Sequence, residues 1–418
     1  MDQRLEIDPE GVVFSCDEGS LLAYPHPAPG VPVMPTHGRR WPLDRVEDGY
    51  TITEPGYQLK LTTNEVRVTA LHLAGAAADG SDQEILRYGC TDGHLTEVTN
   101  SSGRPLRFGC DGHGRITSWT DTNGSRFDYV YDDRDRCTYQ SGTNGHLESA
   151  FTWDEVDPAT GLRLTTVTDG MGHSERHLIN DRAQVVAEID ALGAVTRFAY
   201  DRHNRLLSRT DSLGLVSRTT YDERGRPTVV ERPDGRQTRA EYPDNGMPIR
   251  TIGTYGGVIR QSFDERGNRT SVTDPSGATT RFAYDAAGRL TSVTNPLGAT
   301  TRLVLDRRGL PIEVTDPLGA TTRYEHDAFG RTVRVLDPLG AQTRLEWTVE
   351  GWPSRRTAPD GTVESWTYDG EGNCLSHTDA MGGTTRFTYK DFDLLTSRTG
   401  TDGVRYASTV PSTVVSYP

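Results

Sequence analysis

Carboxylates recur along this chain at a fixed spacing, and paired carboxylates are common machinery for acid–base hydrolysis. The recurring aspartates are Asp201, Asp222, Asp264, Asp285, Asp306, Asp327 and Asp369. Asp285 and Gly288 stand three residues apart, as the first and last positions of a tight β-turn do. An aspartate at the start of a turn accepts hydrogen bonds from nearby backbone amides. The spacing therefore predicts structural turn residues. Calcium binding would need denser acidic clusters than one or two carboxylates per repeat.

Two further residue types could bind metal or react. His173 and His177 are four residues apart, but Ser174 stands where an HExxH zinc site needs glutamate, and the segment resembles a strand. The five cysteines are scattered without a CxxC spacing, which indicates neither a zinc site nor a disulfide framework. They are Cys16, Cys90, Cys110, Cys137 and Cys374. Cys90 and Cys110 fall on adjacent repeats, so a disulfide between them stays open. We expect no catalytic, cofactor-binding or metal site.

Glycines establish an internal period of 21 residues. Twelve of them follow one another at that step from Gly172 to Gly403. Gly103, Gly124 and Gly145 keep the step upstream, and an insertion near residues 155–162 accounts for the longer gap that follows. A fixed period of this length is the signature of a repeat architecture. About fifteen repeats therefore cover residues 88–405. A non-repeat, β-rich segment with a possible capping role (1–87) precedes them, and an irregular tail (406–418) follows.

Each repeat carries two turn signals about ten residues apart, which leaves room for two short strands. The first turn is predicted at Asp201, at Asp222 with Gly225, at Asp264 with Gly267, and at Asp285 with Gly288. The second turn, Asp-Pro-x-Gly in its clearest form, closes at Gly277, Gly298, Gly319 and Gly340. The residue before the first turn is usually aromatic: Tyr200, Tyr221, Tyr284, Trp347, Tyr368 and Tyr389. In all of these except Tyr221, a second large residue stands two positions earlier, so each such pair lies on one face of a sheet. The pattern predicts an all-β chain of hairpin repeats in a curved or spiral sheet, with one drier and one wetter face.

Composition agrees with thin-cored repeats. Only 34% of the residues are hydrophobic, while glycine contributes 44 and proline 23 of the 418. The aromatic residues are too many for a disordered chain. The net charge of −14 disfavours sequence-independent binding of nucleic acid. We find no apolar run long enough to span a bilayer and no secretion signal at the N-terminus.

The motif Tyr-Asp-x-x-Gly-Arg followed by Asp-Pro-x-Gly resembles the YD repeat of the Rhs family. It stands at Tyr221–Arg226 and at Tyr284–Arg289. The resemblance implies a hollow β-shell that holds a C-terminal toxin domain, as in bacterial polymorphic toxins. Related repeats occur in insecticidal toxin complexes, wall-associated proteins and teneurins. The core motif and toxin domain that follow the repeats in this family are not found here, so we expect a fragment of that architecture.

The resemblance predicts a structural shell segment that is not an enzyme and needs no cofactor. Its expected partners are other shell segments or a toxin domain, because about thirty short strands have too little area to enclose a domain. A specialised route would export it to the cell surface or the medium, whereas an orphan fragment would stay in the cytoplasm. The alternative is a cell-surface module that binds glycan or a protein.

Two features keep that alternative open. The aromatic ladder, including Trp347 and Trp366, could stack on sugars, although packing between repeats explains it as well. The arginine at the fifth turn position recurs at Arg205, Arg226, Arg289 and Arg331. We expect it to contact a carboxylate or carbonyl of a neighbouring repeat, and an arginine ladder for a ligand is the alternative.

Overall fold

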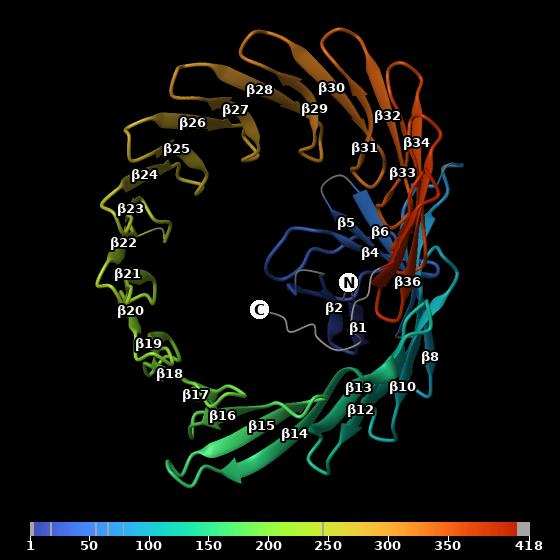
Figure 1. Ribbon diagram of the computed structural model, residues 1–418. Coiled ribbons are helices and arrows are strands. Elements are labelled where there is room, and N and C mark those ends of the chain that lie inside the picture. The colour runs from blue at the N-terminus through green and yellow to red at the C-terminus, as the bar shows by residue number, and fades with distance from the viewer. Residues whose placement is uncertain are drawn as a thin grey trace. The chain divides into compact units, whose positions relative to one another are not determined.

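The computed structural model describes residues 4–16, 19–54, 57–64, 67–77, 79–244 and 246–407. This part of the chain is β-structure with no α-helix; its one helical element is the 3-10 turn η1, Thr143–Gly145. The all-β fold expected from the repeats is confirmed (Figure 1). None of the helical structure described has the length and hydropathy to cross a membrane. Residues 406 and 407 of the predicted irregular tail (406–418) belong to a strand, Arg405–Ala407, and the remainder lies outside the described residues.

The chain divides into two compact units. Unit 1 comprises Met1–Asp128, Val304–Val314 and Thr321–Pro411. Unit 2 comprises Tyr129–Leu303, Thr315–Ala320 and Ser412–Pro418. In both units, strands that follow one another within the long sheet pair antiparallel, as β-hairpins require.

The N-terminal part of unit 1 contains most of the fully buried side chains. Its first three strands form a small sheet in the order β1-β2-β3. Phe14, Leu43 and Ile52 have no solvent exposure and belong to one apolar cluster. Ala328 and Phe329, from a turn late in the chain, pack against this cluster. The non-repeat segment therefore has a conventional core, whereas the repeats form a thin sheet.

The strands before residue 132 are β1 (Arg4–Asp8), β2 (Gly11–Ser15), β3 (Leu21–Tyr24), β4 (Leu43–Val46), β5 (Gly49–Glu54), β6 (Tyr57–Asn64), β7 (Arg67–Leu73), β8 (Gln83–Thr91), β9 (His94–Thr99), β10 (Pro105–Cys110), β11 (Ile116–Thr120) and β12 (Arg126–Tyr131). Those from 137 to 263 are β13 (Cys137–Gly142), β14 (His146–Val156), β15 (Arg163–Asp169), β16 (Ser174–Ile179), β17 (Val185–Ile189), β18 (Val195–Tyr200), β19 (Leu206–Thr210), β20 (Val216–Tyr221), β21 (Pro227–Glu231), β22 (Gln237–Glu241), β23 (Arg250–Ile252) and β24 (Val258–Phe263).

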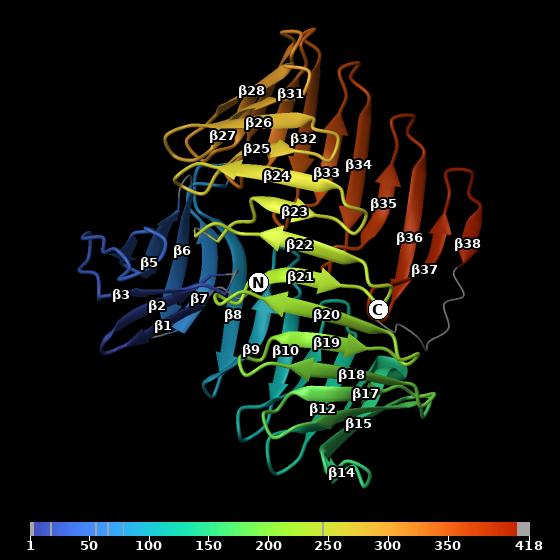
Figure 2. The same cartoon turned by 90° about the vertical axis from the view of Figure 1, so that its left-hand side faces the viewer.

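The remaining strands are β25 (Arg269–Thr273), β26 (Thr279–Tyr284), β27 (Leu290–Thr294), β28 (Thr300–Leu305), β29 (Pro311–Thr315), β30 (Thr321–His326), β31 (Thr332–Leu336), β32 (Gln342–Trp347), β33 (Pro353–Thr357), β34 (Val363–Tyr368), β35 (Cys374–Thr378), β36 (Thr384–Lys390), β37 (Leu394–Thr399) and β38 (Arg405–Ala407). Within unit 2, β18 to β24 lie side by side in sequence order (Figure 2).

The hairpin of β26 and β27 shows how one repeat folds. Arg281 pairs with Thr294 and Ala283 with Ser292, and the register then shifts before Tyr284 pairs with Leu290. This β-bulge follows a three-residue loop with Gly288 at φ +79°, the usual geometry of a type I turn closed by a left-handed residue. Phe282 and Tyr284 are half-buried, whereas Arg281 and Ala283 are exposed. The predicted alternation of a drier ladder face with a wetter exposed face is therefore present in this hairpin.

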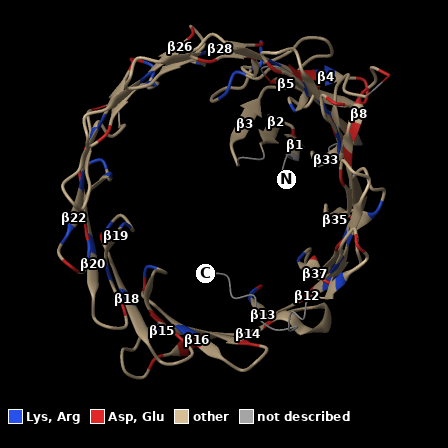
Figure 3. Ribbon diagram, turned by 45° about the horizontal axis from the view of Figure 1, so that its top comes forward, with Lys and Arg blue, Asp and Glu red and all other residues tan. Residues whose placement is uncertain are grey.

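The insertion near residues 155–162 lengthens one hairpin without breaking the sheet. β14 is extended to 11 residues, and its partner β15 begins at Arg163. Leu162 packs on a small cluster formed by Leu164, Leu178 and Ala187. Acidic and basic residues are interspersed along the strands and turns of each unit (Figure 3).

Candidate functional site

The recurring aspartates are fully engaged in their own turns. The Oδ1 atom of Asp285 accepts hydrogen bonds from the backbone N–H groups of Ala287 (2.9 Å) and Arg289 (3.0 Å). Its Oδ2 atom accepts from Nε of Arg289 at 2.7 Å. The same three bonds recur at Asp201 with Arg205 and at Asp222 with Arg226. Asp264 has Asn268 in place of the arginine. Each carboxylate therefore caps its turn.

At several turns these contacts also favour the ionised carboxylate. The backbone N–H and side chain of Arg289 lower the pKa of Asp285, since they hydrogen-bond to the charged form. At the equivalent Asp132, hydrogen bonds from Arg136 lower the pKa to about 2. A general acid at neutral pH needs a raised pKa, which is the opposite shift.

The turn arginine contacts its own turn first, which the sequence analysis did not predict. Arg226 pairs with Asp222 four residues earlier. Its Nη1 atom also donates to the carbonyl oxygen of Pro243 in the next repeat, at 2.8 Å. Its guanidinium lies 4.7 Å from the ring centre of Tyr242, within the range of a cation–π contact. The expected contact with a neighbouring repeat is therefore a second contact of the same side chain.

The ladder residues join successive repeats by a hydrogen bond that apolar periodicity could not reveal. The hydroxyl of Tyr221 donates to the carbonyl oxygen of Leu206, 15 residues earlier, at 2.9 Å. The same 15-residue bond is made by Tyr200, Tyr284, Tyr368 and Tyr389 through the hydroxyl and by Trp347 through Nε1. A polar tip on an apolar body is what tyrosine and tryptophan share. Trp366 instead stacks on His377, with ring centres 5.0 Å apart.

The second turn of each repeat leaves apolar tips in solvent. The Oδ1 atom of Asp274 accepts from the N–H groups of Ser276 and Ala278, and Gly277 completes the turn. Gly298, Gly319 and Gly340 close equivalent turns by donating to Asn295, Asp316 and Asp337. In unit 2, Leu297 and Leu318 are 92% and 95% exposed.

The histidine pair does not form a site. Nδ1 of His173 lies 3.1 Å from Oδ2 of Asp169, in the place that arginine takes in other turns. His177 lies within strand β16, opposite Thr165 and Glu188. In the described ranges, no three His, Cys, Asp or Glu side chains are grouped to hold a metal ion. The five cysteines are free thiols.

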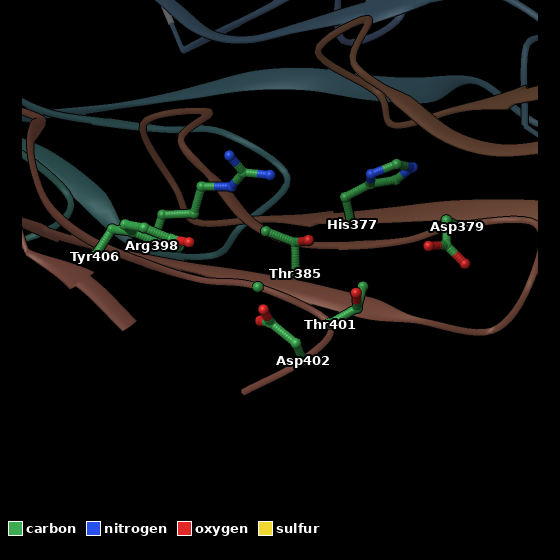
Figure 4. Close-up of a pocket in the computed structure, with 8 residues that line it drawn as sticks. His377, Asp379, Thr385, Arg398, Thr401, Asp402 and Tyr406 are labelled. Atoms are coloured by element: carbon green, nitrogen blue, oxygen red, sulfur yellow. The ribbon is translucent and has the colours of Figure 1, made fainter. Parts of the chain in front are cut away.

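A polar pocket, which sequence analysis missed, lies over β35 to β38 in unit 1 (Figure 4). His377, Thr385, Arg398 and Tyr406 line it from the strands. Asp379, Gly400, Thr401 and Asp402 line it from the turns. A comparison of repeats could have revealed the pocket. His377 and Val335 occupy the same position two repeats apart, so an apolar position of the earlier repeat is polar in the later one. The charges of the pocket are mixed.

A lateral seam within unit 1 joins turns that lie far apart in the sequence. We define the seam as residues 100–127 together with 348–392. The N–H of Ser101 donates to Glu350 (3.1 Å), and the N–H of Thr122 donates to Glu371 (2.7 Å). The two residues of each pair are 249 positions apart in the sequence. Two successive repeats of one run therefore meet two successive repeats of the other with the same offset.

The next repeat of the seam uses an aromatic contact. The ring of Phe392 meets Trp119 and Phe127 edge-on, at centre distances of 5.9 and 6.1 Å. The backbone N–H of Phe392 donates to Oγ of Ser125 at 3.0 Å. The seam therefore fixes the register of two remote runs of hairpins.

Sequence comparison identifies the repeats. The family profile described as RHS Repeat matches seven stretches that together exceed half of the chain: 111–146, 184–216, 200–237, 263–300, 306–341, 326–363 and 368–405. The chain belongs to the RHS repeat family. The resemblance seen in the YD motifs is thereby confirmed.

Relatives of this RHS repeat chain are much longer proteins. It is 29% identical over 127 residues to a protein named probable deoxyribonuclease RhsB from Dickeya dadantii (strain 3937), and the match covers 29% of this chain and 8% of that protein. The solved structure TcdB2-TccC3 shares its fold, with a TM-score of 0.59 at 16% identity over 94% of this chain and 25% of that one. TcdB2-TccC3-Cdc42 gives a TM-score of 0.58 at 16% identity, over 87% and 22%. The chain thus spans about a quarter or less of each.

Proposed function

We propose that this chain is a wall segment of an Rhs-type toxin shell and has no catalytic activity of its own. The proposal rests on one observation: the polar groups that recur in each repeat form hydrogen bonds within the fold. The turn carboxylates bind backbone amides and arginines, and the ladder hydroxyls bind the preceding repeat. Groups held in this way support a wall and leave no paired acid and base for chemistry.

The relatives give the wall its proposed purpose. The matched relative is named a probable deoxyribonuclease, RhsB, and the matched structure is named TcdB2-TccC3. By this analogy the segment would form part of an enclosure for a toxin domain, with further shell segments as its partners. Export by a specialised route to the cell surface or the medium belongs to the same proposal.

Glycan binding through the aromatic ladder has less support. Trp347 and Trp366 are already engaged, the first by its hydrogen bond and the second by the stacked His377. A sugar that stacked on the ladder would need a free aromatic face there.

Two measurements test the proposal. The purified chain, incubated with plasmid DNA and Mg²⁺, should leave the DNA intact, and cleavage by the chain alone would contradict a purely structural role. Limited trypsin digestion should spare the repeats despite 45 lysines and arginines in the chain, because paired strands resist proteolysis. Rapid cutting throughout residues 88–405 would exclude a wall.

The cargo is tested with any domain that the adjoining DNA encodes. The DNA beyond codon 418 would be translated, and any domain found there would be co-expressed with this chain. The proposal expects that domain to co-purify and to be protected from trypsin. A domain that stays free and sensitive would contradict enclosure.

A further inference from the structure

The seam contains an asparagine followed by a glycine, at the third and fourth positions of the turn between β11 and β12. The side-chain Nδ2 atom of Asn123 donates to Oδ2 of Asp369 at 3.0 Å, across 246 positions of the sequence. Asn123 and Gly124 are both exposed to solvent. The hydrogen bond stands next to the bond from Thr122 to Glu371, so both belong to one contact between two turns.

The partner turn is acidic and has no arginine at its fifth position. Asn373 stands where Arg289 stands in the turn of Asp285, and its Nδ2 atom donates to Oδ2 of Asp369 at 3.0 Å. Oδ1 of Asp369 accepts from the backbone N–H groups of Glu371 and Asn373. Asp285 has an ion pair with Arg289, whereas Asp369 has none among the residues that the structure describes. A carboxylate at position 123 would therefore face the unpaired charge of Asp369.

The backbone after Asn123 is open to reaction. Gly124 has a φ of +97°, and no atom beyond its two neighbours lies within 4 Å of the place where a Cβ would stand. The nitrogen of a glycine can approach a preceding side chain closely, because no Cβ obstructs it. The N–H of Gly124 donates to the carbonyl oxygen of Asp121 at 3.2 Å, whereas the same turn bond of Gly193 is 2.9 Å long. A bond at the long end of the usual range protects this N–H only weakly.

We propose that Asn123 is a site of spontaneous deamidation and that the carboxylate it produces opens this contact of the seam. The nitrogen of Gly124 loses its proton to hydroxide and attacks Cγ of Asn123. A new C–N bond forms, the Cγ–Nδ2 bond breaks, and the amide nitrogen leaves as ammonia after taking a proton from water. Water then opens the cyclic imide to aspartate or isoaspartate. The net reaction consumes water and releases ammonia, with no change of oxidation state.

The product loses a donor of the seam and gains a negative charge in the same place. Nδ2 of Asn123 becomes a carboxylate oxygen, which accepts hydrogen bonds and cannot donate one to Asp369. Two carboxylates at hydrogen-bond distance do not both stay ionised without a strong repulsion. The isoaspartate product also lengthens the backbone of the turn, so the turn can no longer close with the same hydrogen bonds. Both products therefore separate this turn from that of Asp369.

Ageing of the purified chain tests the site. The parent and an Asn123→Gln variant are incubated at mildly alkaline pH, since the longer side chain of glutamine forms the cyclic imide far more slowly. Circular dichroism verifies that the variant folds. Peptide mass spectrometry should find the exchange of amide for acid at residue 123 of the parent, and urea unfolding should show a loss of stability that the aged variant escapes. The other Asn-Gly pairs, at Asn144 and Asn245, age in both samples, so the difference reports on Asn123. An Asn123 that remains an amide throughout the incubation would overturn the proposal.

Direct substitution tests the effect on the seam. Asn123→Asp should raise the equilibrium constant for unfolding at least about tenfold at low salt, through the lost hydrogen bond and the repulsion. Added salt should reduce this loss, because it screens the two charges. Asn295→Asp is the matched control and should not raise the constant, since Asp316 makes the same two backbone contacts in its own turn. Equal losses in the two variants, or in the aged parent and aged Asn123→Gln, would show that deamidation does not act through the seam. No cargo enters these measurements, so their outcome is independent of the proposed shell function.

Discussion

At the scale of single residues, the ladder tyrosine is the joint between successive repeats. Tyr221 contributes a half-buried ring, and its hydroxyl satisfies a carbonyl group of the previous hairpin. A neutral hydrogen bond of this kind contributes about 1 kcal/mol. Tyr221→Phe should therefore lower the free energy of unfolding by about 1 kcal/mol, measured by urea denaturation. Tyr255→Phe, at a ring that is 82% exposed, serves as the control and should change it by less than about 0.5 kcal/mol. Equal effects would show that the 15-residue bond contributes little.

At the residue scale, Ala183 replaces the turn glycine without the short polar side chain that Asp135 and Asn204 have at the same position. Ala183 has φ +57° in the place that glycine takes in most repeats. The left-handed conformation costs a residue with a Cβ about 1 kcal/mol. Ala183→Gly should raise the free energy of unfolding by about 0.5–1 kcal/mol in thermal or urea denaturation. Ala286→Gly is the control, because residue 286 does not have a left-handed conformation. Glycine there only increases the conformational entropy of the unfolded chain, which lowers the free energy of unfolding. A destabilised Ala183→Gly variant would contradict the assigned strain.

At the scale of elements, the seam depends on backbone donors that proline would remove. Thr122 occupies the second turn position, where Pro275 stands in an equivalent turn. Thr122→Pro should preserve the turn, since proline favours this position. It should remove the N–H that Glu371 accepts and lower stability by about 1–2 kcal/mol. Urea unfolding monitored by the fluorescence of Trp119, which contacts Phe392 in the seam, would measure this.

Two variants separate the seam from the turn itself. Ala191→Pro makes the same change in a turn whose residue 191 has no seam contact, and should leave stability unchanged or slightly raised. Thr122→Ala keeps the N–H and should cost less than Thr122→Pro. If both proline variants behave alike, the Glu371 contact does not hold the seam.

The sequence predicts the elements better than it predicts their mutual contacts. The strands and turns follow from Asp285, Gly288 and the alternation of Phe282 and Tyr284, all local signals that recur every 21 residues. The seam pairs Thr122 with Glu371 across 249 residues, and no local pattern specifies such a pairing. One exposed strand arginine per repeat, from Arg197 to Arg302, can be read from the sequence, but the net charge of the chain conceals it. The net charge of −14 is a sum over acidic turns and basic strand residues.

At the scale of the whole molecule, the turn aspartates couple stability to pH. Hydrogen bonds from backbone amides and from the turn arginine lower the pKa of Asp222 and Asp285, and that of Asp132 falls to about 2. Each carboxyl group has a lower pKa folded than unfolded. Its stabilising contribution is therefore complete above the unfolded value near 4 and is lost as pH falls toward 2. The urea midpoint should be nearly constant from pH 7 to about 5 and should fall steeply between about pH 4 and 2.

Asparagine at the turn position provides the control for this acid sensitivity. Asn295 accepts the same two backbone N–H bonds through Oδ1 as the aspartates do, without a charge. The triple variant Asp201→Asn, Asp222→Asn and Asp285→Asn should therefore fold. It should be less stable than the parent at pH 7, because the pairs with Arg205, Arg226 and Arg289 are lost. Its midpoint should then fall less between about pH 4 and 2, since three of the responsible groups no longer titrate. Parallel pH profiles for the parent and the variant would show that acid acts on other groups, most directly on seam carboxylates such as Glu350. Partial desolvation raises the pKa of Glu350, but hydrogen bonds from Ser101 outweigh it, so this pKa is also lowered.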